Sequence, residues 1–323
     1  MSADTQRHPD RHRSSRALLG IATTVLALSG CGLRLDTPPP QAPTPDEAES
    51  LRQDAAAATA RLLGTTERTD GAGPASEVLT RITRDAEAQL AALGGVWQAW
   101  PDGAPEGVTP PEPAATAPAE DPDVTDVLDL LTASAADARE AATTAPTADL
   151  AALLGSVAIA RGEAAQDLAE VADAEPPESE AAPLTLRVLR QRGVDGPTVQ
   201  VLDQARFAYE TVAARTTGSS REDAEDRARE LQSLVDGAIR LGAPDSRLEA
   251  YQLPGPDEEA GLSANQAAAV RAETLLAEHW LFSLGRAESD VRSGLLAAAA
   301  DSVDRIELWG AALPALPGLP PES

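Results

Sequence analysis

Apolar residues recur along most of the chain at alternating spacings of three and four residues, the period of a helix with one buried side. The first two stretches carry this pattern at Ala48, Leu51, Ala55, Ala58 and Leu62, and at Leu79, Ile82, Ala86, Leu90 and Leu93. Gly94 and Gly95 follow the second stretch directly, and glycine is the residue that most often ends a helix. The pattern therefore predicts two amphipathic helices in the first 95 residues.

The same period continues through the rest of the chain. It predicts further helices at about 197–215, 220–241, 263–284 and 287–312, with a short apolar stretch at 184–189. Between the two halves it predicts one helix that carries Val124, Val127, Leu128 and Leu131, and another that carries Leu150, Leu153, Leu154, Val157, Leu168 and Val171. Pro197 suits the first turn of its helix, Ser220 suits an N-cap, and Gly242 suits a C-terminal stop. The sequence predicts an all-α protein with eight helices.

Proline-rich stretches divide these helices into groups. They lie at 31–45, 101–123 and 174–183, and at 314–323, where they form a tail. Because proline opposes helix and these stretches hold few large apolar residues, we expect spacers and mobile linkers there. The predicted helical domains are 46–173, with its loop at 101–123, and 184–313.

Seams of alanine and leucine let helices approach closely and nearly antiparallel, so each domain is predicted to be a four-helix bundle. Leu93-Gly94 falls on Leu241-Gly242 when the chain is shifted by 148 residues. Two hypotheses stay open: an internal duplication, or two bundles without common origin.

Composition narrows the functions. Aromatic residues make up only 2% of the 323 residues, which favours helix over sheet. The formal net charge of −26 repels phosphate backbones, so no nucleic-acid partner is expected. A single cysteine permits no internal disulfide.

The N-terminal segment has the layout of an export signal. Four arginines precede the apolar run at 17–28, which is too short as a helix to span a bilayer. Residues 1–30 are therefore predicted to be a signal peptide.

The next residues, Leu28-Ser29-Gly30-Cys31, resemble the lipobox of bacterial lipoproteins. The resemblance implies cleavage between Gly30 and Cys31 and a diacylglyceryl group on the Cys31 sulfur, with acyl chains such as palmitate. Two acyl chains give firm attachment, so it implies an extracytoplasmic protein anchored to the outer face of the cytoplasmic membrane.

The second half resembles another family. The runs DQARFAYETVAARTTG and RELQSLVDGAIRLGAPDSRLEAYQLPGP, followed by two Ala-rich helices and WGAALPALPGLP, are similar to a ferritin-like domain of unknown function. That domain occurs in exported proteins and lipoproteins of high-GC Gram-positive bacteria. The resemblance covers about 197–320 and implies a four-helix ferritin-like fold, without an activity.

A ferritin-like fold invites a count of metal ligands. A carboxylate-bridged two-metal site uses Glu-x-x-His on two helices, because that spacing puts both groups on one helical face. No Glu-x-x-His occurs here, and Leu276 stands three residues before His279. We therefore expect no metal and no cofactor.

Polar residues on apolar helix faces are the remaining candidates for a site. Asp203, Arg206 and Tyr209 share one face of their helix, and Glu278 or His279 could meet them from a facing helix. Such a buried polar cluster could hold a small ligand, or it could be an ion pair that fixes helix register. His279 alone is either a ligand or a hydrogen-bonded core residue.

No catalytic motif was found, so the leading hypothesis is a non-catalytic helical module that binds an envelope protein. Two alternatives stay open. One is a metal-dependent redox protein on the ferritin-like scaffold, and the other is a small-molecule binding protein with a pocket between helices.

Overall fold

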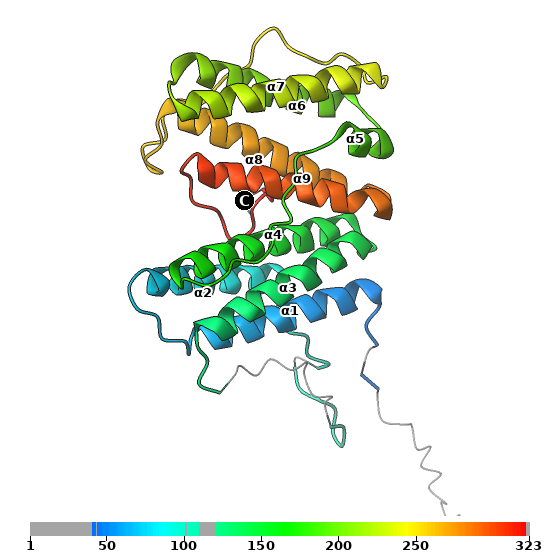
Figure 1. The fold of residues 1–323 in the computed structure, drawn as a ribbon. Helices are drawn as coiled ribbons and strands as arrows, with labels where there is room; N and C mark the ends of the chain where they lie inside the picture. The colour runs from blue at the N-terminus through cyan, green and yellow to red at the C-terminus, as the bar shows by residue number, and fades with distance from the viewer. Residues whose placement is uncertain (1–40, 43, 101, 110–119, 321–323) are drawn as a thin grey trace, which may run out of the picture. The chain divides into compact units, whose positions relative to one another are not determined.

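The computed structural model describes residues 41–42, 44–100, 102–109 and 120–320. The predicted signal peptide and Leu28, Ser29, Gly30 and Cys31 lie outside these residues. Within the described residues the chain forms nine α-helices and no β-strand, which confirms the all-α prediction (Figure 1).

Four helices form the first helix group. They are α1 (Glu47–Thr66), α2 (Pro74–Ala92), α3 (Val124–Thr144) and α4 (Ala148–Val171). Sequential helices pack as pairs, α1 on α2 and α3 on α4, and the pairs meet through α1 on α3 and α2 on α4. Each helix thus buries most of the apolar side that its sequence pattern predicts, although Val171 at the end of α4 is exposed.

Five helices form the second helix group: α5 (Leu186–Arg192), α6 (Gly196–Arg215), α7 (Ser219–Arg240), α8 (Ala264–Leu284) and α9 (Ser289–Leu308). Here α6 packs on α7, α8 packs on α9, and the pairs meet through α6 on α8. The short helix α5 contacts both α7 and α9.

Helix α5 was predicted only as an apolar stretch, and two glycines explain its position. A Cβ added to Gly237 of α7 would come within 2.1 Å of Leu186, and one added to Gly294 of α9 within 2.6 Å of Val188. Leu189 of the same helix is fully buried. Helix α5 therefore fits where its neighbours lack side chains.

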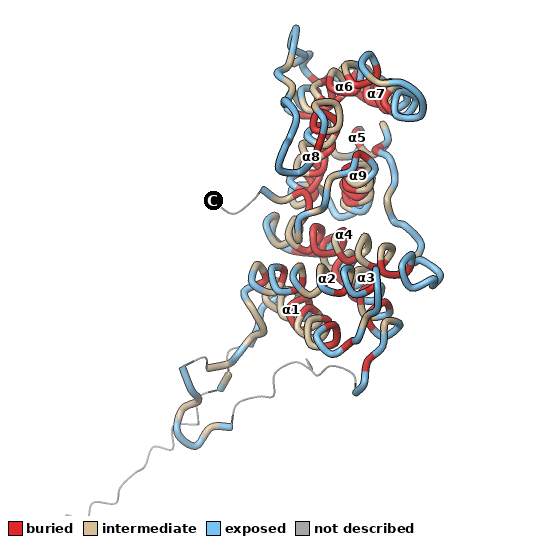
Figure 2. The backbone as a smooth tube through the Cα atoms, turned by 90° about the vertical axis from the view of Figure 1, so that its left-hand side faces the viewer, coloured by how far each residue is buried: buried red, intermediate tan, exposed pale blue. Residues whose placement is uncertain are grey.

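One hydrophobic cluster extends across both helix groups, and a second one lies within the first group. Helix α4 contacts α8 and α9, and α3 contacts α9. Buried residues lie on the sides of the helices that face other helices (Figure 2). The contact is close at Gly285, at the end of α8, where an added Cβ would lie 2.4 Å from the Ala148 carbonyl oxygen. One hydrophobic cluster contains Leu154 and Ile159 of α4 together with Leu281 and Leu296.

Two predicted helix boundaries differ from those in the structure. The predicted end of the last helix at 312 was wrong: Gly310 adopts φ 89°, and the Ala311 N–H donates to the Ile306 carbonyl, which closes α9 at Leu308. Helix α7 begins at Ser219 after Gly218, which gives no side-chain cap, so Ser220 is not the N-cap.

Both proline-rich segments near the second group lie against helices. Between α4 and α5, the Ala182 N–H donates to the Ala297 carbonyl of α9. In the predicted tail, the carbonyl of Ala315 accepts from Gln89 of α2, and that of Pro317 accepts from Ser156 of α4. The tail thereby ties the end of the second group to the first.

Part of the predicted loop at 101–123 lies outside the described residues. Among the helices that the structure describes, none combines the length and apolar character needed to cross a membrane.

Candidate functional site

The most deeply buried ion pair lies in the second helix group. Arg227 of α7 donates from Nε to Glu273 Oε1 at 2.9 Å and from Nη2 to Glu273 Oε2 at 2.8 Å. The side chains are 4% and 0% exposed. Both oxygens of the carboxylate are thus held by one guanidinium, the strongest geometry for this pair.

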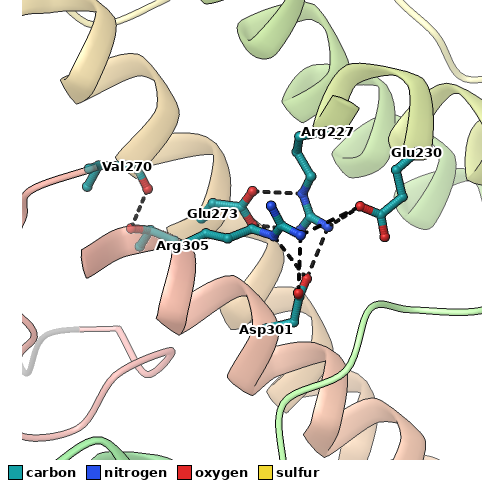
Figure 3. A network of polar contacts seen from close by, with 7 residues as sticks. Arg227, Glu230, Val270, Glu273, Asp301 and Arg305 are labelled. Carbon is teal, nitrogen blue, oxygen red and sulfur yellow. Dashed lines mark hydrogen bonds and ion pairs between the residues drawn. The ribbon is translucent and has the colours of Figure 1, made fainter. Parts of the chain in front are cut away.

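Further charges extend this pair into a network (Figure 3). Arg227 Nη1 also donates to Glu230 of α7 at 2.9 Å and to Asp301 of α9 at 3.0 Å, and Arg305 donates to Asp301 at 3.2 Å. Burial alone would lower the pKa of Arg227, but the carboxylates outweigh it and raise that pKa further. The network binds α7, α8 and α9 together.

This network gathers the buried carboxylates of α7, α8 and α9, so it is the arrangement to compare with a metal site. Its carboxylates come from three helices, but both Glu273 oxygens and one of Asp301 accept from Arg227. A guanidinium and a metal ion would compete for the same oxygens. Among the described residues, no group of three or more His, Cys, Asp or Glu side chains is arranged to hold a metal ion. These residues do not fit a two-metal centre.

Asp203 and Arg206, predicted as part of one cluster, do meet. Asp203 is fully buried and accepts from Arg206 Nε at 2.9 Å, while Arg206 also pairs with the half-exposed Glu210. The other Asp203 oxygen accepts from the Tyr251 hydroxyl at 2.8 Å. Tyr251 opens the YQLPGP segment, so this pair anchors the loop between α7 and α8.

Tyr209 and His279 have their contacts elsewhere. The Tyr209 ring packs 6.0 Å from that of Trp309, and its hydroxyl is buried beside Glu273; burial and that charge raise the pKa of Tyr209. His279 Nε2 lies 3.1 Å from Thr198 Oγ1 at the start of α6. Glu278 is half-buried next to it on α8. The predicted five residues are therefore distributed over three separate places.

His279 is partly exposed, yet its surroundings favour the neutral imidazole. Burial, reinforced by the positive charge of Arg192, lowers the pKa of His279 to about 4, with Asp195 opposing the shift. Its ring meets Trp280 edge-on at 4.9 Å. Thr198 and Trp280 thus contact the imidazole on two sides.

The first helix group also buries an arginine. Arg161 of α4 is 1% exposed and donates to Gln89 of α2, Thr59 of α1 and the Ser134 carbonyl of α3. All four helices thus converge on one guanidinium with neutral acceptors. Burial lowers the pKa of Arg161 to about 10.

A hollow of about 500 Å³ lies between α3, α4 and α9, with residues 177–181 along one side. Its inner wall includes Ala158, Ile159 and Ala300, and polar groups reach it from Arg139 and Glu163. The site thus combines an apolar floor with five ionisable side chains, which are Arg139, Glu140, Glu163, Glu178 and Glu180.

Glu163 also belongs to an acidic cluster between α4 and α9. Burial raises the pKa of Glu163 to about 9, with Asp304 opposite it as the next cause. Burial and Asp167 raise the pKa of Glu307 to about 7. The Asp304 Oδ1 atom is buried without a hydrogen-bond partner among the described residues. A proton held by Glu163 would supply that partner.

Sequence reasoning missed Arg227, Glu273, Arg161 and Glu163. A usable signal was present, because Arg227 stands on the apolar side of α7 between Ala224 and Leu231. A charged residue at a stripe position predicts a buried pair, although its partner on another helix cannot be read from spacing.

Comparison with known proteins bears on the second helix group alone. No curated protein and no solved structure matches the chain. Residues 198–321, which run from the first turn of α6 past α9, match the family described as a domain of unknown function (DUF4439).

Proposed function

We propose that the protein is an extracytoplasmic lipoprotein, a non-catalytic helical binding module held by acyl chains on Cys31 at the outer face of the cytoplasmic membrane. The observation that carries this proposal is the run Leu28-Ser29-Gly30-Cys31 after a basic and then apolar segment. The proline-rich residues that follow would act as a spacer before α1 begins at Glu47.

The buried charges support binding rather than catalysis. Arg227, Glu273 and Asp203 are engaged by partners within the helix groups, so they are not free to act on a substrate. The formal net charge of −26 argues against nucleic acid as the partner.

The ferritin-like interpretation of the fold is part of this proposal. Helices α1–α4 and α6–α9 share the same order of contacts, with two sequential pairs joined through their first members. This agreement supports two related four-helix bundles and an internal duplication. The groups differ at one contact. In the first group α2 packs on α4, whereas in the second group α5 contacts both of the corresponding helices, α7 and α9.

The metal-dependent alternative loses its support, because the carboxylates of the second core are held by Arg227 and Arg305. The small-molecule alternative gains support from one observation, the hollow of about 500 Å³ between α3, α4 and α9. We retain it as the second candidate function.

A Cys31→Ser substitution tests the tether. Serine cannot accept the lipid through sulfur, so we expect the variant to leave the membrane fraction, and a labelled fatty acid to be lost from the chain. Gly32→Ser is the matched control, since it places the same residue one position later, and it should stay membrane-bound. A Cys31→Ser protein that remained in the membrane fraction would contradict the proposal.

A further inference from the structure

The hollow between α3, α4 and α9 has the size and lining of a binding site. Its volume of about 500 Å³ falls within the range of small-molecule pockets, on the order of 300–1,000 Å³. Ala158 and Ile159 of α4 and Ala300 of α9 are buried and give it an apolar floor. Gly162 also lines it, and a Cβ added there would meet nothing within 4 Å.

Arg139 gives this hollow an unused set of hydrogen-bond donors. The residue is half-buried, and within the described part of the chain no hydrogen bond or ion pair of its guanidinium is present. Glu180 acts on it only as a nearby charge. A guanidinium offers five N–H donors and no acceptor, so a partly buried one favours an anionic partner.

Glu163 lies on the inner side of the hollow. Burial and the facing Asp304 raise the pKa of its carboxyl group to about 9, which favours the protonated form at neutral pH. The proton is shared with Asp304, so Glu163 adds no negative charge to the floor.

The rim of the hollow is negatively charged. Glu140, Glu178 and Glu180 line the hollow and are exposed. These exposed carboxylates oppose the binding of any anion, although solvent and salt screen them, so Arg139 is the group of the lining that can attract one. A ligand with two negative charges would be repelled more strongly than a ligand with one.

We propose that this hollow binds a small monocarboxylate with an apolar body. The carboxylate accepts hydrogen bonds from Arg139, and the hydrocarbon lies on Ala158, Ile159 and Ala300. This inference rests on the second candidate function, the small-molecule binding protein.

Isothermal titration of the full chain in detergent, with octanoate as the probe, tests the proposal. We expect saturable binding of one octanoate per chain. Suberate adds a second carboxylate at the same length, and octylamine reverses the charge, so both should bind at least about tenfold more weakly, a difference of about 1.4 kcal/mol. Equal binding of octylamine, or no saturable heat with octanoate, would overturn the proposal.

Two pairs of variants locate the site. Arg139→Gln should weaken octanoate binding at least about tenfold, because it removes the charge-assisted hydrogen bonds to the carboxylate. Arg215→Gln, at an exposed arginine outside the hollow, should leave it unchanged. Gly162→Leu should fill the floor and abolish binding, whereas Gly162→Ala should retain it. Octanoate affinity that survives both Arg139→Gln and Gly162→Leu would refute this location.

Thermal unfolding of each variant shows whether a loss of octanoate affinity is caused by unfolding of the chain. Arg139 and Gly162 have no partners whose loss would unfold the chain, so we expect near-native melting temperatures. The Cys31→Ser experiment measures membrane attachment and the titration measures ligand binding, so failure of one is distinguishable from failure of the other.

Discussion

Single buried charges dominate the energetics of the second helix group. Arg227→Met would leave the fully buried Glu273 without its bidentate partner. Breaking such a pair from one side costs about 3–5 kcal/mol, because the remaining charge is uncompensated. We expect the free energy of unfolding, measured by urea titration with tryptophan fluorescence, to fall by that amount.

Two comparisons isolate the cause of this loss. Arg221→Met removes an exposed pair with Glu225, and it should cost less than about 1 kcal/mol. Adding Glu273→Gln to Arg227→Met removes the orphaned charge and should recover part of the loss. Equal effects of Arg227→Met and Arg221→Met would show that the buried network does not stabilise the fold.

His279 makes stability depend on pH in the acid range. Its folded pKa of about 4 lies below the unfolded value of 6.5, so the unfolded chain binds the proton first as the pH falls. The contribution of neutral His279 is therefore complete above about pH 6.5 and is lost as the pH falls towards 4. We expect His279→Gln to remove this part of the pH dependence.

An NMR titration of the imidazole measures the same shift directly. His8 and His12 lie in the predicted signal peptide, so the processed chain would give one histidine signal. A midpoint near 6.5 would mean that the ring is solvated, against the hydrogen bond to Thr198.

Close packing between helices is tested at the contact of α4 with α8. Gly285→Ala places a methyl group 2.4 Å from the Ala148 carbonyl oxygen, so the two backbones would have to separate. Overpacking of this kind costs about 1–3 kcal/mol. Gly162→Ala, in the open middle of α4, should instead stabilise by about 0.5–1 kcal/mol through helix propensity. A Gly285→Ala protein as stable as the parent in chemical denaturation would rule out this close approach.

The contact between α4 and α9 makes stability depend on pH in the opposite direction. The folded pKa of Glu163, about 9, lies above the ordinary 4.5, so the folded chain keeps a proton that the unfolded chain has released. Stability should fall as the pH rises from about 4.5 through 9. In urea titrations across this range, the free energy of unfolding of Glu163→Gln should fall less than that of the parent.

Glu170→Gln is the matched control, because Glu170 is exposed on the same helix. It should follow the parent at every pH. If Glu163→Gln and the parent lose stability in parallel, the proton is not held at this contact.

The helices were predictable because each buries one stripe, and the period of three and four residues records that stripe directly. Helix α5 was not, because seven residues are too few to show a period and its place depends on Gly237 and Gly294 in other helices. The buried polar groups were missed for a similar reason. Asp203 and Arg206 meet on one helix, as predicted, whereas Arg227 and Glu273 meet across two.

At the scale of the whole molecule, the described helices form one unit rather than two independent ones. The carbonyls of Ala315 and Pro317 accept hydrogen bonds from α2 and α4, and α4 packs on both α8 and α9. Proline-rich composition predicted a tail at 314–323, but it says nothing about which donors its backbone carbonyls meet. The two helix groups should therefore unfold together.

The central claim is that this helical unit is a lipoprotein held by Cys31. Intact-mass spectrometry of the chain extracted from bacterial membranes tests it most directly. We predict a chain that begins at Cys31 and carries the added mass of a diacylglyceryl group. A chain that begins elsewhere, or one whose Cys31 thiol is unmodified, would contradict the claim.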